Sequence, residues 1–110
     1  MRPISVGINP TAGATTTVYT VPTGYYALFN LLYVHNTGAN NKNLTVQWYD
    51  ASAATSIDIL TAVPYNSKAY TQFDNAYVVF EEGDQLRVTP EAASAFVIIA
   101  TFEQIGLTRQ

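Results

Sequence analysis

The sequence predicts an all-β domain, an antiparallel β-sandwich or barrel with about eight strands. Three observations support this prediction. Short segments of alternating or β-branched residues recur at spacings near 10 residues, and clusters of Gly, Pro, Asn and Asp separate them. The helix-friendly window at residues 91–95 is too short to be stable alone.

Composition limits the class of protein. The 110 residues are enough for one domain with its own core, 48% are apolar and only 12% are charged, which argues against disorder. There is no Cys, so disulfide scaffolds, thiolate zinc sites and cysteine nucleophiles are excluded. No segment predicts a signal peptide or a membrane span. We therefore expect a single domain over 1–110, with a possible N-terminal arm at 1–10 and a C-terminal tail at 105–110.

The charge distribution argues against nucleic-acid binding. The net charge is -3 and the pI is near 4.7. Binding to phosphates depends on clustered basic side chains. The five basic residues are scattered along the chain: Arg2, Lys42, Lys68, Arg87 and Arg109.

The first half of the chain contains the longest predicted strand. Residues 4–8 alternate and predict a first strand, and residues 16–21 are β-branched and predict a second. A turn with Pro22 and Gly24 leads into residues 25–36. This stretch is apolar at both its odd and its even positions, so we expect a central strand whose second face is covered by another copy or by a partner. We assign Leu28, Leu32 and Val34 to the core and expect Asn30 to reveal which face is buried.

The middle of the chain predicts two alternating strands. In residues 44–50, one face carries Leu44, Val46 and Trp48, which we assign to the core. In residues 56–62, Ile57 and Ile59 alternate with polar residues and are also assigned to the core.

The second half predicts four more segments. Residues 68–73 predict a weak edge strand, and residues 77–80 a compact apolar one. Residues 85–89 place Leu86 and Val88 inward. Residues 96–102 are apolar on both faces, with core positions at Ile98 and Phe102, and they predict a central pair with residues 25–36.

No pattern of residues predicts catalysis, a metal or a cofactor. His35 is the only His, and at the end of a strand it is more typical of a loop rim than of a ligand. Glu81, Glu82 and Asp84 surround Gly83, but this acidic run is shorter than a calcium-binding loop and favours a turn in which Gly supplies positive φ and Asp caps the backbone. We therefore expect no enzyme activity.

Tyrosine is more frequent than a core requires. There are eight Tyr, and Tyr is enriched at protein interfaces because its large ring carries a polar end. Tyr also favours β-strands, which accounts for part of the number. The tyrosines at predicted turns or edges are candidate interface residues: Tyr25, Tyr26, Tyr65 and Tyr70.

The order of four segments resembles a known family. These segments are TTTVYTVPTGYYALFNLLYVHNTG at 15–38, NLTVQWYD at 43–50, VVFEEGDQLRV at 78–88 and AFVIIATFEQIG at 95–106. Together they resemble small virion proteins of tailed bacteriophages, in which a "VYTVP-G" strand and turn leads into a long strand and an "F-EGDQL" turn precedes the last two. The resemblance covers nearly the whole chain and rests on turn and core residues.

The resemblance implies a jelly-roll-like β-sandwich and a structural role. It implies a capsid decoration (cement) protein that binds the major capsid protein or other virion proteins and stabilises the assembled head. From the residues themselves, without a cofactor motif, a basic cluster or a long apolar run, we expect no cofactor, nucleic acid or membrane. The resemblance also implies a homo-oligomer, with a trimer favoured, located in the phage particle after assembly in the host cytoplasm. Within the N-terminal arm, Arg2 and Ile4 are the candidate contacts with neighbours.

Two alternatives remain open from the sequence. The same fold also serves tail, neck, baseplate or fibre components. A carbohydrate-binding, lectin-like module is a third possibility, because jelly rolls also occur in lectins.

Overall fold

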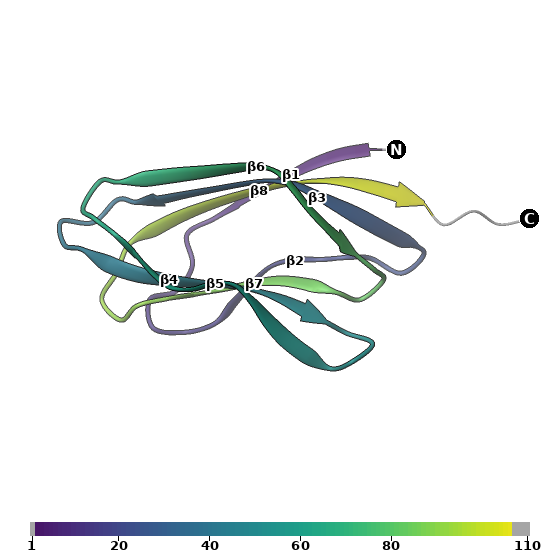
Figure 1. Cartoon of the computed structure of the whole chain (residues 1–110), viewed down its shortest axis with the longest axis horizontal. Helices are drawn as coiled ribbons and strands as arrows, with labels where there is room; N and C mark the ends of the chain where they lie inside the picture. Colours follow the sequence, from purple (N-terminus) through teal and green to yellow (C-terminus); the bar gives the residue numbers. More distant parts are fainter. Residues whose placement is uncertain (1, 107–110) are drawn as a thin grey trace, which may run out of the picture.

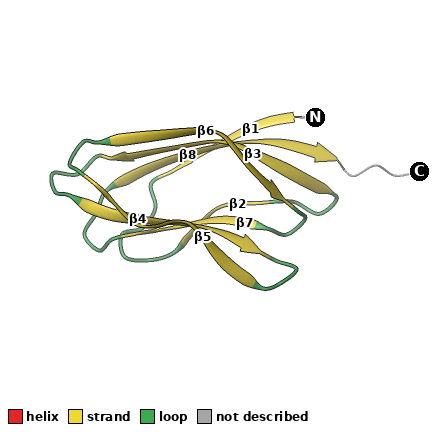
Figure 2. Cartoon of the chain, in the orientation of Figure 1, coloured by secondary structure: helices red, strands yellow, loops and turns green. Residues whose placement is uncertain are grey.

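The computed structural model describes residues 2–106, without the side chains of Arg2 and of residues 74–77. The described residues form eight strands and no helix (Figures 1 and 2). None of them therefore forms a helix that could span a membrane. The strands are β1 (Arg2–Ile8), β2 (Thr16–Thr20), β3 (Tyr25–Asn36), β4 (Lys42–Asp50), β5 (Thr55–Tyr65), β6 (Tyr70–Phe80), β7 (Gln85–Pro90) and β8 (Phe96–Gly106).

The strands form two four-stranded sheets that lie over one another as layers (Figure 1). The first sheet has the order β1-β8-β3-β6 and the second the order β2-β7-β4-β5. All neighbouring strands are antiparallel. Only β4 and β5 are consecutive strands of one sheet, so every other connection crosses between the layers. This arrangement is a jelly-roll sandwich and confirms the predicted fold class.

The long strand β3 pairs with β8 over its whole length, from Tyr25 opposite Gly106 to Asn36 opposite Phe96. Both strands lie in the interior of the first sheet, which confirms the predicted central pair. The N-terminal segment is an edge strand, β1, that pairs with β8. Strand β8 extends to Gly106, so the first two residues of the expected tail belong to the sheet, and residues 107–110 lie outside the described residues.

A β-bulge in β3 changes which side chains point inward. The register with β6 and β8 shifts between Phe29 and Leu31. Ala27 and Phe29 are buried before the bulge, and Leu32 is buried after it. One extra residue moves the following side chains to the opposite face, so the buried set passes from odd to even positions.

The bulge also corrects the prediction for Leu28. This residue was expected in the core with Leu32, because both have even numbers. It precedes the bulge, however, and therefore lies on the outer face, half-buried. Asn30 is the extra residue relative to β8 and is half-buried.

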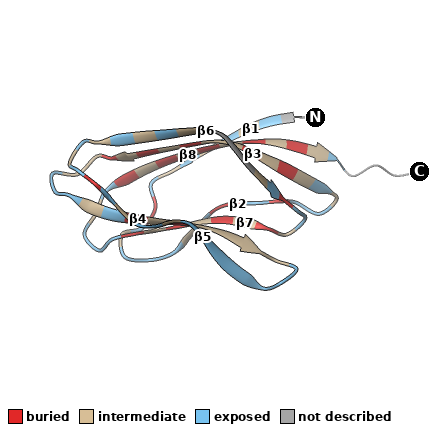
Figure 3. Cartoon of the chain, in the orientation of Figure 1, coloured by how far each residue is buried: buried red, intermediate tan, exposed pale blue. Residues whose placement is uncertain are grey.

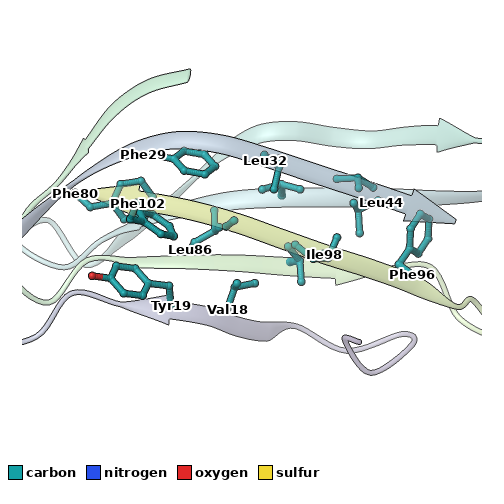
Figure 4. Packing of buried hydrophobic residues seen from close by; sticks show 14 of the residues in the cluster. Val18, Tyr19, Phe29, Leu32, Leu44, Phe80, Leu86, Phe96, Ile98 and Phe102 are labelled. Carbon is teal, nitrogen blue, oxygen red and sulfur yellow. The ribbon is translucent and has the colours of Figure 1, made fainter. Parts of the chain in front are cut away.

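Four aromatic rings fill one end of the core (Figure 4). The Phe102 ring stacks on Tyr19 at 4.2 Å and on Phe29 at 5.1 Å between centroids, and it meets Phe80 edge-on at 5.4 Å. Tyr19 belongs to the second sheet and the phenylalanines to the first, so this cluster joins the layers. The other residues assigned to the core that are fully buried are Leu32, Val34, Leu44, Val46, Leu86, Val88 and Ile98. Trp48 is half-buried and packs against this core.

The core assignment of Ile57 and Ile59 is wrong. Their side chains are 47% and 36% exposed, and β5 is an edge strand whose exposed residues are visible in Figure 3. The pairing of β5 with β4 shifts twice, on either side of Val46. These shifts leave Leu60 and Val63, rather than the predicted isoleucines, packed against the core.

The predicted strands at 68–73 and 77–80 are one strand in the structure. Strand β6 runs from Tyr70 to Phe80 and pairs with β3 on both sides of its bulge. The polar residues between these two segments interrupt the strand pattern, so the sequence predicted two strands.

The exposure of Ile57 leads to a stability prediction. We expect Ile57→Thr to change the free energy of unfolding by less than about 0.5 kcal/mol, as exposed substitutions do. Leu60→Ala, on the same strand but packed against the core, should cost more. Urea denaturation of both variants tests this, and a loss of several kcal/mol for Ile57→Thr would contradict the edge position.

Two buried phenols are expected to lower stability at high pH. Burial raises the pKa of Tyr65 and of Tyr19 above the usual value of 10.0, and a hydrogen bond with Gln104 partly lowers the pKa of Tyr19. In the unfolded chain these groups lose their protons at lower pH than in the folded chain. The unfolded state then binds fewer protons, so stability is complete below about pH 10 and falls as the pH rises through the folded pKa values.

Thermal melts between neutral pH and pH 11 test this expectation. The melting temperature should fall above about pH 10, and Tyr65→Phe should reduce that fall. Tyr25→Phe removes an exposed phenol and is the matched control. Identical pH profiles for Tyr65→Phe and the unmodified chain would show that the Tyr65 phenol does not contribute.

Candidate interaction surface

The outer face of the first sheet is a broad surface of apolar side chains that no other part of the described chain covers. On β8, buried Ile98 and Phe102 alternate with Val97, Ile99 and Thr101, which point outward. We call this surface the outer face. It is formed by Pro3, Ser5, Gly7, Tyr26, Leu28, Leu31, Tyr33, His35, Tyr70, Gln72, Val79, Val97, Ile99, Thr101, Glu103 and Ile105.

The strand register places these side chains in rows across the sheet. Tyr33 lies opposite Ile99 on one side and Gln72 on the other. Leu31 lies opposite Thr101, whose hydroxyl is hydrogen-bonded to Ser5 at 2.9 Å. The described side chains at the centre of the outer face therefore carry aliphatic, aromatic and hydroxyl groups.

Among the described side chains of the outer face, the carboxylate and the imidazole lie toward its two ends. Among the described side chains there, Glu103 is the acidic one and His35 the basic one. Glu103 lies opposite Leu28, whereas His35 lies opposite Val97, six residues away along β8. At about 3.3 Å per residue, this separation is about 20 Å.

On the second sheet, the outward side chains of β4 and β7 are mainly polar, whereas the edge strand β5 exposes Ile57 and Ile59. The Arg87 guanidinium lies 3.9 Å from the centre of the Tyr49 ring. Gln47 donates a hydrogen bond to Asp58 at 2.9 Å, and this bond together with one from Thr61 holds the pKa of the Asp58 carboxyl below its usual value. A sandwich with solvent on both sides carries polar residues on both outer faces. The first sheet departs from this rule, because the outward side chains of its central strands β3 and β8 are mainly apolar.

Aromatic side chains gather at both ends of the outer face. Toward one end, the rings of His35 and Tyr70 lie 5.9–6.5 Å from each other and from the ring of the central Tyr33, and Tyr70 is 65% exposed. At the other end Tyr25 and Tyr26 line an open pocket of about 350 Å³ together with Val79, Glu81 and Glu82. Glu82 accepts a hydrogen bond from the Gly24 amide at 2.9 Å, which fixes the turn beside this pocket.

The structure separates the residues assigned to an interface from the sequence. Tyr26 and Tyr70 lie on the outer face at opposite ends, and Tyr25 is 39% exposed at its margin. Ile4 lies opposite Phe102 on the inward side of β1 and is half-buried. The side chain of Arg2 lies outside the described residues.

The interface assignment of Tyr65 is wrong. Its ring is 4% exposed and meets Phe96 edge-on at 5.9 Å within the core. Its hydroxyl lies near Thr71 but has no hydrogen-bond partner of good geometry among the described residues. The sequence placed Tyr65 in a turn, whereas it is the last residue of β5 and points inward.

Sequence reasoning missed the apolar centre of the outer face. Leu31, Tyr33, Val97 and Ile99 were not named as interface residues, although their strands were expected to have a second covered face. The sequence did indicate a second covered face, because both strands are apolar at odd and even positions. It could not be assigned to particular residues without the position of the bulge.

Two buried polar residues fix the loops at the ends of the sandwich. The Asn36 amide donates to the carbonyls of Asn40 and Tyr65 at 2.9 and 3.0 Å and accepts from the Gly38 amide at 3.0 Å. Asp84 is 2% exposed, so the predicted acidic turn is capped as expected but its capping carboxylate is not solvated. Among the described residues, no group of three or more His, Asp or Glu side chains is placed to hold a metal ion.

Comparison with known proteins shows the fold. No protein-family model and no curated protein matches the sequence. A solved structure of Bacillus endospore appendages, described as disulfide-linked pili, is similar with a TM-score of 0.58 and 13% identity, over 96% of this chain and 86% of that one. A structure of infectious bursal disease virus, Gt strain, has a TM-score of 0.53 and 9% identity, over 92% of this chain and 31% of the viral one.

A third similar structure is weaker. A chain of the cyanophage Pam1 capsid has a TM-score of 0.32 and 15% identity, over 96% of this chain and 82% of that one. At this TM-score the likeness carries no argument. The first two comparisons show that this chain shares a β-sandwich fold with proteins of those assemblies.

Proposed function

We propose that this protein is a non-enzymatic structural subunit of a virus particle, and specifically a decoration protein of a tailed-phage capsid. The observation that carries the proposal is the outer face, whose central strands present mainly apolar side chains that no other part of the described chain covers. In the single chain, four apolar residues of its central strands are only half-buried: Leu31, Tyr33, Val97 and Ile99. Large exposed apolar patches mark surfaces that are covered in an assembly.

The size of the outer face fits an assembly contact. Four strands at about 4.8 Å spacing and about 30 Å of strand length give a footprint of about 600 Å². Covering it on both partners buries about 1,200 Å², the lower end of the range for specific protein–protein interfaces. The proposed partner class is another β-rich virion protein or a second subunit of this one.

Binding to an assembled shell would stabilise that shell by mass action. A ligand that binds the assembled state and not the free subunits shifts the equilibrium towards assembly. The low charge of the chain suits this role, because its contacts would then depend little on salt. The similarity to a viral structure is consistent with the proposal through the shared fold alone.

Binding to capsid shells that lack this protein tests the proposal. The purified protein should co-sediment with such shells and raise their disassembly temperature. Ile99→Asp, which buries a charge in the proposed contact, should reduce binding at least tenfold, as an unpaired interfacial charge does. Thr20→Asp, an exposed position on the second sheet, is the matched control. Absence of binding by the unmodified protein would overturn the proposed function.

Simple measurements distinguish the alternative functions from that of a decoration protein. A tail, neck, baseplate or fibre component would be present in far fewer copies per virion than a decoration protein. A lectin-like module would bring exposed aromatics together over one groove, and the pocket lined by Tyr25 and Tyr26 is the candidate for it; a glycan array tests it. A disulfide-linked polymer such as the similar pili cannot form from these 110 residues, because they contain no Cys.

A further inference from the structure

We infer that the pocket at the start of β3, which we call the tyrosine pocket, is a binding site for the guanidinium group of an arginine side chain. The pocket has a volume of about 350 Å³, within the usual range of ligand sites. Its lining residues are Tyr25, Tyr26, Val79, Glu81 and Glu82. The inference goes beyond the proposed function and does not depend on it, because the site can be filled in the free protein.

The walls of the tyrosine pocket attract cations through their aromatic rings. The Tyr25 side chain is 39% exposed and that of Tyr26 is half-buried, so both rings are accessible from solvent in part. The face of an aromatic ring attracts a positive charge, and a planar guanidinium also stacks on it. Val79 is 49% exposed and gives the apolar wall on which the methylene stem of an arginine packs.

The charged groups of the tyrosine pocket select the same ligand. Glu81 and Glu82 are both exposed, and each supplies a carboxylate, which accepts hydrogen bonds and donates none when ionised. One oxygen of Glu82 already accepts from the Gly24 amide at 2.9 Å, and the other oxygens face no such demand. A guanidinium has five N–H donors and no acceptor, and it matches carboxylate geometry. Two carboxylates would repel an anionic ligand.

The second sheet contains the same combination of groups with a guanidinium in place. The Arg87 guanidinium lies 3.9 Å from the centre of the Tyr49 ring, and its Nε donates to the Gln85 side-chain oxygen at 2.7 Å. One ring and one neutral oxygen are therefore enough to hold an arginine on this protein. The tyrosine pocket offers two rings and two carboxylates, and carboxylates are stronger acceptors than an amide oxygen.

Main-chain hydrogen bonds join the two turns that form the tyrosine pocket. The Val21 amide donates to the Asp84 carbonyl at 3.0 Å, and the Gly83 amide donates to the Val21 carbonyl at 3.1 Å. The turn before β3 and the turn after β6 are therefore fixed to each other before a ligand binds. A site that is already formed loses less conformational entropy on binding.

The guanidinium can come from another protein or from this chain. Three described basic side chains are engaged elsewhere, through loop carbonyls or an aromatic ring: Lys42, Lys68 and Arg87. The side chains of Arg2 and Arg109 lie outside the described residues. Arg109 comes three positions after Gly106, which lies opposite Tyr25. The experiment therefore includes a variant without either arginine, Arg2→Gln with Arg109→Gln.

An NMR titration of the isotope-labelled protein with N-acetyl-arginine methylamide tests the site. This probe has a guanidinium and no other charge, and its citrulline analogue is a neutral isostere. We expect saturable shifts of the amides at 24–26 and 79–82, with a dissociation constant on the order of millimolar, and binding of the citrulline analogue roughly tenfold weaker. The titration is done on the unmodified chain and on the variant without Arg2 and Arg109.

Three results of this titration would overturn the inference. The first is the absence of saturable shifts in both proteins. The second is equal binding of the arginine probe and its citrulline analogue, which would show that the positive charge is not recognised. The third is binding of a neutral methyl glucoside at these residues without binding of the arginine probe, which would favour the lectin-like alternative.

Neutral isosteres of the carboxylates test the lining. Glu81→Gln should weaken binding of the arginine probe roughly threefold, and Glu81→Gln with Glu82→Gln roughly tenfold, because exposed ion pairs are lost. Glu91→Gln is the matched control, because Glu91 is also exposed and also accepts from a main-chain amide, that of Asn43 at 2.8 Å. An equal loss of binding for Glu91→Gln would show an effect of net charge alone and would overturn the site.

The contribution of the ring is tested by a pair of substitutions at one position. Tyr25→Ala removes the ring and should weaken binding of the arginine probe roughly threefold, whereas Tyr25→Phe keeps the ring face and should bind like the unmodified chain. Circular dichroism shows that each variant is folded. Unchanged binding by folded Tyr25→Ala would contradict stacking on this ring.

The variant without Arg2 and Arg109 identifies the source of the guanidinium. If the source is this chain, the variant shifts the amides of Tyr26 and Glu81 before any probe is added, and it binds the probe more tightly than the unmodified chain. If the source is another protein, the two proteins bind the probe equally. Both results support the site.

The tyrosine pocket and the proposed function fail separately. The titrations use the purified chain alone, whereas the decoration role is tested with capsid shells. A protein that binds the arginine probe but no shell would keep the site and overturn the decoration role. A protein that binds shells but not the probe would do the reverse.

Discussion

Replacing Phe102 with alanine is expected to lower the free energy of unfolding by about 3–5 kcal/mol, the usual cost of truncating a buried aromatic ring. Phe102 is fully buried at the centre of the aromatic cluster, in contact with Tyr19 of the second sheet and with Phe29 and Phe80 of its own. Its removal leaves a cavity between the layers that β-strands paired on both sides cannot close.

Urea denaturation with a two-state fit measures this change. Val79→Ala is the matched control, because Val79 is 49% exposed and its truncation should cost less than about 1 kcal/mol. A loss of under 1 kcal/mol for Phe102→Ala would contradict the tight packing of the aromatic cluster between the sheets.

Replacing Asp84 with alanine is expected to cost about 3–5 kcal/mol through lost hydrogen bonds. Its buried carboxylate accepts from the Trp48 indole at 3.1 Å and from the amides of Ala51 and Glu81 at 2.9 Å each. Alanine would leave these three donors without their acceptor in a partly buried turn. Each donor that loses a charged partner costs about 1–3 kcal/mol.

A double-mutant cycle with Trp48→Phe separates the indole contribution from the rest. The cost of Asp84→Ala should be smaller in the Trp48→Phe background, because the indole donor is already absent. Glu81→Ala removes an exposed carboxylate of the same turn and should change stability little. Equal costs for Asp84→Ala and Glu81→Ala would show that the buried network does not contribute.

The sequence predicts the fold class and the central pair because side-chain alternation is a local property. Residues 44–50 alternate without interruption, and Leu44 and Val46 are fully buried. Turn residues also act locally, so Gly83 has the positive φ expected of it. The pairing of residues 25–36 with 96–102 was predicted because strands apolar on both faces belong in the interior of a sheet.

Features set by pairing between strands could not be predicted in the same way. The bulge at Asn30 depends on the register with β6 and β8, and it moved Leu28 to the outer face. The position of β5 at an edge, which exposes Ile57 and Ile59, follows from the order of strands in the sheet. Neither property is encoded in the alternation of one segment.

The sequence predicted that the outer face exists, but it did not identify the residues at its centre. Two strands with a second apolar face implied a cover from outside the core, and the outer face is that surface. The number of tyrosines indicated an interface but not its residues. Tyr65 and Tyr70 both lie near predicted turns or edges, yet Tyr65 is buried and Tyr70 is exposed. Asn36 was also missed, since a buried amide at a strand end has no signature without its loop partners.

The most direct test of the central claim is a density map of an intact particle that contains this chain. We predict that the outer face, with Leu31, Tyr33 and Ile99 at its centre, is covered by another protein subunit in that map. Density that leaves this face open to solvent, with the second sheet forming the contacts, would contradict its assignment as the assembly surface.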